Sequence, residues 1–151
     1  MDKIICFDMD GTIADLFGVE DWAEKIDSGD FSPYQDAEPL YNMDCLNEIL
    51  YELIAQGWEI QVISWLALHG TKEFNNEIRK QKRAWLKKYS FPASKCHFVK
   101  YGTPKSSCLH KDISSAILID DNEKVRKSWR LGMTINPQTE DLFECLTALL
   151  N

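Results

Sequence analysis

Two pairs of aspartates stand directly after apolar runs in this sequence. Asp8 and Asp10 follow "IICF" at 4–7, and Asp120 and Asp121 follow "AILI" at 116–119. Carboxylates this close raise each other's pKa unless a cation lies nearby. Mg²⁺ suits such a site, because it binds carboxylate oxygens, keeps some waters and completes its shell with a substrate phosphate. A single aspartate in this place favours a turn cap, whereas two pairs at two strand ends favour magnesium and phosphate chemistry.

The remaining sequence alternates expected strands with expected helices. Strands are expected over 3–8, 58–64, 96–101, 116–120 and 133–136, and helices over 44–56, 72–89, 123–130 and a C-terminal segment marked by Leu142, Phe143, Leu146, Leu149 and Leu150. This alternation predicts an α/β fold in a single domain, 1–151, with a parallel sheet covered on both faces by helices. Ligands of such sheets bind at the carboxyl ends of the strands. The aspartates and Ser64, which ends the 58–64 strand, are therefore expected at one edge.

Four short motifs containing these residues resemble those of the haloacid dehalogenase-like (HAD) phosphatases. "DMDGT" at 8–12 is similar to the family's first motif, DxDGT, and "VIS" at 62–64 to its second. "ILIDD" at 117–121 resembles the paired-acid form of the fourth. Lys105, in "YGTPKSS", is the best candidate for the lysine of the third motif, with Lys100, Lys95 and Lys111 as alternatives. The resemblance implies the three-layer, Rossmann-like HAD fold.

The same resemblance implies a Mg²⁺-dependent phosphomonoester hydrolase that acts through an aspartyl-phosphate intermediate. Asp8 would be the nucleophile. Asp10 would be the general acid for the leaving oxygen and then the base for the attacking water. Lys105 would neutralise the charge of Asp8 and the phosphoryl group.

Further residues take binding roles by the same resemblance. The expected substrate contacts are Thr12, the hydroxyl of Ser64 and the backbone N–H of Trp65. The expected metal ligands are the side chain of Asp8, the backbone carbonyl of Asp10, and Asp120 and Asp121. Which of the last two contacts the ion directly stays open, with Asp120 favoured.

The segment 15–43 and the substrate leave alternatives open. This segment is rich in aromatics and lies where family members carry caps, so it is either a short lid or a loop packed on the domain edge. The form of the fourth motif looks somewhat like the 5'(3')-deoxyribonucleotidase branch, which implies a nucleoside monophosphate. Sugar phosphates, phosphoproteins and nucleic-acid ends are the alternative substrates. A phospho-accepting receiver-like domain and an inactive binding module are the rival functions.

Composition narrows the partners. A net charge of −7 argues against a nucleic-acid polymer or an anionic membrane as the main partner. No stretch has the length and apolarity of a transmembrane helix, and five scattered cysteines without a C-x-x-C pair favour a cytoplasmic protein with reduced thiols. A small-molecule phosphomonoester is the expected partner, and the oligomeric state is left open.

A basic run within the expected helix 72–89 has two interpretations. It contains Arg79, Lys80, Lys82, Arg83, Lys87 and Lys88. The run could attract a nucleotide or nucleic acid. The favoured interpretation is a solvated helix face, because Phe74, Ile78, Trp85 and Tyr89 mark the buried one.

Overall fold

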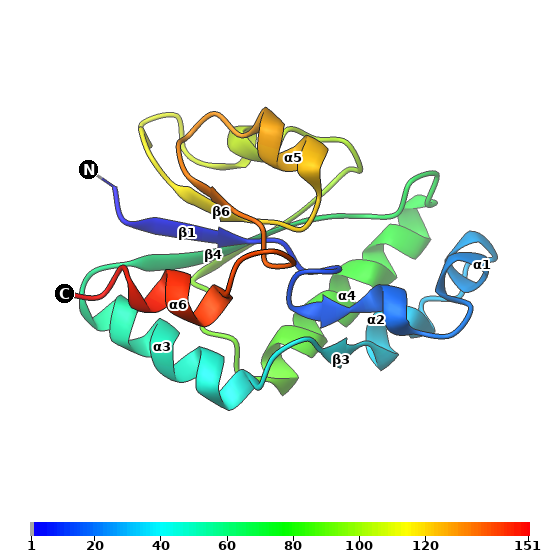
Figure 1. The fold of residues 1–151 in the computed structure, drawn as a ribbon. Coiled ribbons are helices and arrows are strands. Elements are labelled where there is room, and N and C mark those ends of the chain that lie inside the picture. Colours follow the sequence, from blue (N-terminus) through cyan, green and yellow to red (C-terminus); the bar gives the residue numbers. More distant parts are fainter. Residues whose placement is uncertain (1) are drawn as a thin grey trace.

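The computed structural model describes residues 2–151 and is built around a five-stranded parallel sheet (Figure 1). Its strands lie in the order β5 (Lys95–Val99), β4 (Glu59–Trp65), β1 (Ile4–Phe7), β6 (Ile117–Ile119) and β7 (Thr134–Ile135). All neighbouring pairs are parallel. The strands lie close to their predicted ranges, and the predicted Rossmann-like α/β fold is confirmed.

Helices cover both faces of the sheet, as predicted. Helices α3 (Met43–Ala55), α4 (Lys72–Lys88) and α6 (Leu142–Thr147) lie on one face, and α5 (Glu123–Ser128) lies on the other (Figure 1). Side chains of β1 alternate between the two resulting cores. Ile5 and Phe7 belong to the larger core with α3 and α4, whereas Ile4 and Cys6 pack in the smaller one with α5.

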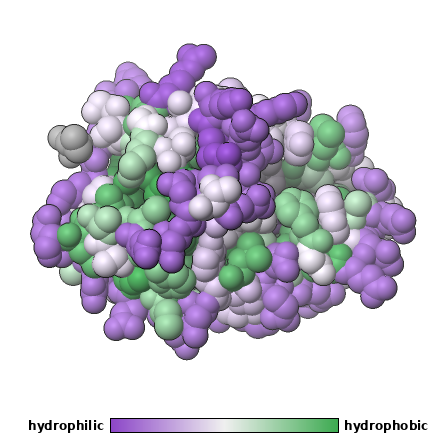
Figure 2. All heavy atoms as spheres, viewed as in Figure 1, coloured by the Kyte–Doolittle hydropathy of each residue, from purple (hydrophilic) through white to green (hydrophobic). Residues whose placement is uncertain are grey.

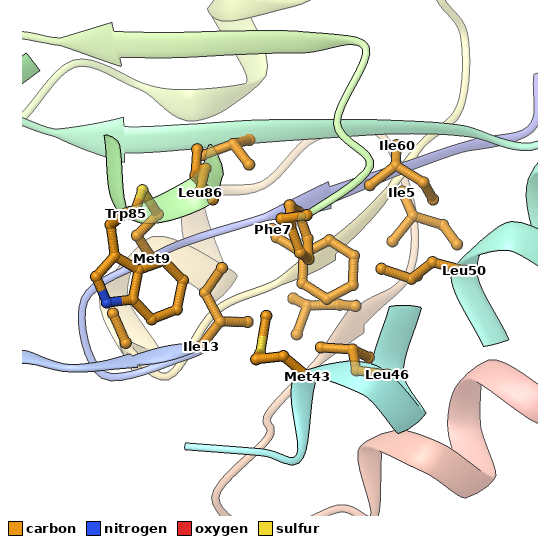
Figure 3. Packing of buried hydrophobic residues seen from close by; sticks show 14 of the residues in the cluster. Ile5, Phe7, Met9, Ile13, Met43, Leu46, Leu50, Ile60, Trp85 and Leu86 are labelled. Atoms are coloured by element: carbon orange, nitrogen blue, oxygen red, sulfur yellow. The ribbon is translucent and has the colours of Figure 1, made fainter. Parts of the chain in front are cut away.

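The larger core anchors β1 beneath the candidate site. Figure 3 shows Leu46 and Leu50 of α3 directed toward Ile5 and Phe7, all four of them fully buried. Burial of each such side chain stabilises the fold by about 1.5–3 kcal/mol. The end of β1, where Asp8 begins, is therefore held in a fixed place.

The segment between β1 and α3 forms short elements that the sequence pattern did not predict. They are β2 (Ala14–Asp15), the 3₁₀ helix η1 (Leu16–Gly18), α1 (Trp22–Asp27), α2 (Ser32–Asp36) and β3 (Glu38–Pro39). Strand β2 pairs antiparallel with β3, and the indole N–H of Trp85 on α4 donates to the carbonyl of Ala37 at 2.8 Å. This segment is thus packed against α4 at one end of the sheet (Figure 1).

Strand order places a topological switch at β1. The chain runs from β1 to β4 and β5 on one side, then crosses to β6 and β7 on the other. Crevices at such switch points are the usual ligand sites of open α/β sheets.

In the space-filling view, hydrophobic residues lie in separate patches among hydrophilic ones (Figure 2). Within residues 2–151, the helices lack the combination of length and apolarity that crossing a bilayer requires.

Candidate active site

The two aspartate pairs come together at the switch point. Asp8 and Asp120 follow neighbouring strands whose last residues, Phe7 and Ile119, are in register. One carboxylate oxygen each from Asp8, Asp120 and Asp121 lies within 4.8 Å of the others. The predicted gathering of acids from separate segments at one sheet edge is confirmed.

Lys105 lies inside this group of acids. It begins the 3₁₀ helix η2 (Lys105–Cys108), and its side chain is 3% exposed. Its Nζ donates to Asp8 Oδ1 at 2.9 Å and to Asp120 Oδ2 at 2.7 Å. Burial alone would lower the pKa of Lys105, but the two carboxylates outweigh it and raise the pKa above its usual value. The alternative Lys100 is exposed, so Lys105 is the lysine that the fold brings to the acids.

The DMDGT loop is shaped by its glycine and threonine. Gly11 has φ +81°, and a Cβ at this position would overlap a carboxylate oxygen of Asp121. The hydroxyl of Thr12 lies 3.0 Å from Asp8 Oδ2 and 3.3 Å from Asp121 Oδ1, and it accepts from the Asp121 N–H at 3.2 Å. The small residue and the hydroxyl together allow the loops after β1 and β6 to meet.

Hydrogen bonds also hold Asp120 in place, at the end of β6. The backbone N–H of Asn122 donates to Asp120 Oδ1 at 2.9 Å, and Arg126 donates to the Asp120 carbonyl at 3.0 Å. Burial, followed by the charge of Asp8, raises the pKa of both Asp120 and Asp121. A nearby divalent cation would offset this, because it favours the charged form of each carboxylate.

Asp10 faces a second buried lysine, which sequence reasoning missed. Lys82 of α4 is 1% exposed, and its Nζ lies 3.0 Å from Asp10 Oδ2. The interpretation of the whole basic run as a solvated face is therefore wrong for this residue. Lys82 stands four residues after Ile78 and three before Trp85, so it belongs to the buried stripe of the helix. That spacing was the available signal.

The three predicted substrate contacts lie at different depths. Thr12 and Ser64 are fully buried, the first against Asp8 and Asp121 and the second against Lys82, whose Nζ is 2.6 Å from its oxygen. Neither of these two residues lines the pocket, because both side chains are fully buried and their hydroxyl groups contact other side chains. Trp65 does line the pocket.

A pocket of about 320 Å³ opens over the acids. This volume lies within the range of small-molecule sites. Its lining combines Asp8, Asp10, Asp120 and Asp121 with aromatic side chains from the segment 15–43, from the end of β4 and from the loop after β5. Three of the lining residues, Phe17, Leu68 and Tyr101, are exposed large hydrophobics. The pocket thus has an acidic floor and an apolar rim.

The charges of this lining fit a divalent cation. Among the described residues that line the pocket, five are aspartates, Asp27 included, and one is a lysine, Lys105. Such a lining repels a phosphate dianion unless a cation is bound. Its donors are carboxylate oxygens, which Mg²⁺ prefers. Asp8, Asp120 and Asp121 are thus the residues that would hold the ion.

Comparisons with known proteins support the fold. No protein-family model matches this chain, and no curated protein sequence matches it. Among solved structures, the chain is similar to D,D-heptose 1,7-bisphosphate phosphatase from Burkholderia thailandensis. The TM-score is 0.52 and the sequence identity 13%, over 87% of this chain and 75% of that one. The chain therefore has a Rossmann-like α/β fold that it shares with this phosphatase.

Proposed function

We propose that this protein is a Mg²⁺-dependent phosphomonoester hydrolase that forms an aspartyl-phosphate intermediate on Asp8. One observation carries the proposal: Asp8, Asp120 and Asp121 converge within 4.8 Å, with Lys105 bound to Asp8 and with Asp10 lining the same pocket. The fold shared with a phosphatase adds support.

The chemistry proceeds in two transfers. A carboxylate oxygen of Asp8 attacks phosphorus, the P–O bond to the leaving group breaks, and Asp10 gives that oxygen its proton. Water then attacks the phosphorus of the intermediate, Asp10 takes a proton from it, and inorganic phosphate leaves while Asp8 is regenerated. Lys105, which already lies against Asp8, opposes the charge on the transferring group.

Protonation of Asp10 before the first transfer is supported by its surroundings. Burial raises the pKa of this carboxyl, the charge of Lys82 opposes the rise, and the charge of Asp8 adds to it. Bound Mg²⁺ supplies neutralisation of the phosphoryl oxygens.

Addition of Mg²⁺ to metal-free protein is expected to raise the unfolding temperature, and more so at pH 8 than at pH 5.5. The pKa values of Asp120 and Asp121 are raised, so protons are bound more tightly by the folded state than by the unfolded one. Metal-free stability therefore falls as pH rises from about 4 toward neutrality. The ion binds the deprotonated acids, so it restores more stability at the higher pH, where the acids have lost their protons.

Mg²⁺ at about 100 times its Kd stabilises the folded state by about 2.7 kcal/mol. This corresponds to a rise of roughly 5–10 °C in the unfolding temperature for a chain of this size. Differential scanning calorimetry at the two pH values, with EDTA and then with Mg²⁺, measures the shift. A shift that is larger at pH 5.5, or no shift at either pH, would contradict a carboxylate-bound ion.

The pocket rim supports a substrate with a planar ring. Trp65 and Tyr101 lie side by side with ring centroids 4.8 Å apart, and Trp65 is fixed because its indole N–H donates to the Thr103 carbonyl at 2.8 Å. Phe17 and Trp22, which also line the pocket, form a second aromatic pair with centroids 4.8 Å apart. A nucleobase fits such surfaces, so we propose a nucleoside monophosphate as substrate, with the segment 15–43 acting as a short lid.

Phosphate release from an aryl phosphate, with Mg²⁺ and with EDTA, tests the proposed function. Multiple turnovers that require the ion are expected. A single turnover followed by a stable phosphoprotein would favour a receiver-like domain, and no release from any phosphomonoester would favour an inactive binding module. A panel of nucleoside monophosphates, sugar phosphates, phosphopeptides and phosphorylated oligonucleotides, compared by kcat/KM, then identifies the substrate class.

Replacement of Tyr101 by Ala is expected to raise the KM for nucleoside monophosphates about 10-fold and to leave the KM for a sugar phosphate unchanged. Stacking of a base on an aromatic side chain contributes about 1–3 kcal/mol, and about 1.4 kcal/mol corresponds to a factor of ten. Tyr101 is 47% exposed, so its removal leaves the fold intact. Tyr51→Ala, on α3 and similarly exposed, is the matched control. Equal KM changes for both substrates would exclude stacking on this ring.

A further inference from the structure

Lys82 forms a buried network that the reaction described above does not use. Its ammonium group lies within hydrogen-bond distance of three acceptors: Asp10 Oδ2 at 3.0 Å, Ser64 Oγ at 2.6 Å and the Trp65 carbonyl at 2.7 Å. An ammonium group has three hydrogens, so each of them has an acceptor. Its donor capacity is thus filled by the protein alone.

These acceptors come from two separate segments. Asp10 belongs to the loop after β1, whereas Ser64 and Trp65 end β4. The ring of Tyr34, on α2, covers the ammonium group with its centroid 5.3 Å from Nζ. Lys82 therefore links the Asp10 loop to the neighbouring strand β4, and Tyr34 of the segment 15–43 covers the ammonium group.

The network leaves one oxygen of Asp10 free. Lys82 holds Oδ2, and within residues 2–151 no donor is found on Oδ1. Although Oδ1 has no partner among the described residues, it is not fully buried, and Asp10 lines the pocket. Oδ1 is consequently the oxygen that can meet a leaving group or a water molecule.

We propose that Lys82 is a positioning residue that holds the carboxyl group of Asp10 so that Oδ1 faces the leaving oxygen of the substrate. This role rests on the proposed phosphatase function and deepens it. Lys82 does not line the pocket, so its ammonium group acts through Asp10 and not on the substrate. Without Lys82, no side-chain hydrogen bond within residues 2–151 fixes the orientation of the Asp10 carboxyl group.

The leaving group reveals such a role. An aryl phosphate releases a stabilised phenolate, which needs little help from an acid, whereas an alkyl phosphate releases an alkoxide that must be protonated. General acid catalysis contributes about 10²–10⁴-fold. Lys82→Met is expected to lower kcat/KM about 100-fold more for an alkyl phosphate than for p-nitrophenyl phosphate. The ratio of the two values is independent of the fraction of folded enzyme, so a purely structural defect leaves it unchanged.

Matched variants separate the possible outcomes. Lys80→Met removes an exposed lysine from the same helix and is expected to change neither value. Asp10→Asn is expected to change the ratio as Lys82→Met does, and the double variant Asp10→Asn/Lys82→Met to change it no further, because the lysine acts through the acid. Lys82→Gln, which keeps a donor without the charge, replaces Lys82→Met if that variant does not fold.

A measurement without turnover accompanies the kinetics. Urea unfolding of both single variants and the double variant is expected to show energetic coupling between Lys82 and Asp10. Coupling together with an unchanged ratio of the two kcat/KM values, that is, with equal losses on both substrates, would overturn the positioning role. The contact would then serve only stability. A wild-type protein that hydrolyses neither phosphate would overturn the phosphatase function itself and the role of Lys82 with it.

Discussion

Replacement of Asp8 by Asn is expected to abolish phosphate release, by about 10⁴-fold or more, because the attacking group is removed. The carboxamide has nearly the shape of the carboxylate, so its oxygen can still accept from Lys105 or Thr12, which contact the two oxygens of Asp8 in the wild type. The fold and its unfolding temperature are thus expected to persist. Colorimetric detection of phosphate and calorimetry of the same preparation measure both effects.

The intermediate provides a direct test of this assignment. Acid quenching during turnover, followed by peptide mass spectrometry, is expected to find a phosphoryl group on Asp8 in the wild type and none in the variant. Asp36→Asn, an exposed substitution on α2, serves as the control that retains full activity. Near-normal turnover by Asp8→Asn would show that another group attacks phosphorus.

The fold was predictable because its elements repeat simple patterns. The apolar runs at 4–7 and 117–119 form neighbouring central strands, and the helix predicted over 44–56 is α3, with the side chain of Asn42 accepting from the Cys45 N–H at 3.1 Å as its N-cap. Strand alternation is visible over about four to eight residues, but a helical period of 3.6 needs a window of about 11–18 residues. The elements of 15–43 are too short for a period to emerge, so α1 and α2 were missed.

The acidic half of the site could also be predicted, since Asp8 and Asp120 directly follow β1 and β6 and the second aspartate of each pair lies within two residues of the first. Parallel strands bring their carboxyl ends to one edge, so placing the strands also places Asp8 and Asp120. Lys105 follows the sheet less directly, through a turn after β5, and other lysines nearby had to stay open as alternatives.

Lys82 shows where this reasoning stops. Its position between Ile78 and Trp85 places it on the buried face of α4, but five other basic residues nearby hid this pattern. Burial of a lysine is costly without partners. Those partners, Asp10, Ser64 and Trp65, lie 72, 18 and 17 residues away in the chain. Only the tertiary structure shows that these partners converge, so the basic composition of the run favoured a solvent-exposed position for Lys82.

Replacement of Lys105 by Met is expected to impair both stability and turnover, whereas Lys100→Met, on an exposed lysine, changes neither. The substitution leaves Asp8 and Asp120 buried without their counter-charge, and breaking a buried pair in this way costs about 3–5 kcal/mol. The pKa of Lys105 lies above its usual value, so the group is charged throughout the neutral range and its loss is felt there.

The size of the stability loss depends on what else can neutralise the acids in the Lys105→Met variant. Lowering the pH protonates Asp120, whose pKa is already raised, so the loss is expected to be smaller at pH 5.5 than at pH 8. Saturating Mg²⁺ offsets part of it by supplying another cation. Turnover is not recovered in either way, because the donor that opposes charge on the transferring phosphoryl group is missing, and kcat falls by about 10²–10³-fold. Urea unfolding at both pH values, with and without Mg²⁺, and kcat at saturating metal separate the two roles, and a Lys105→Met enzyme with normal kcat would leave this lysine a structural part only.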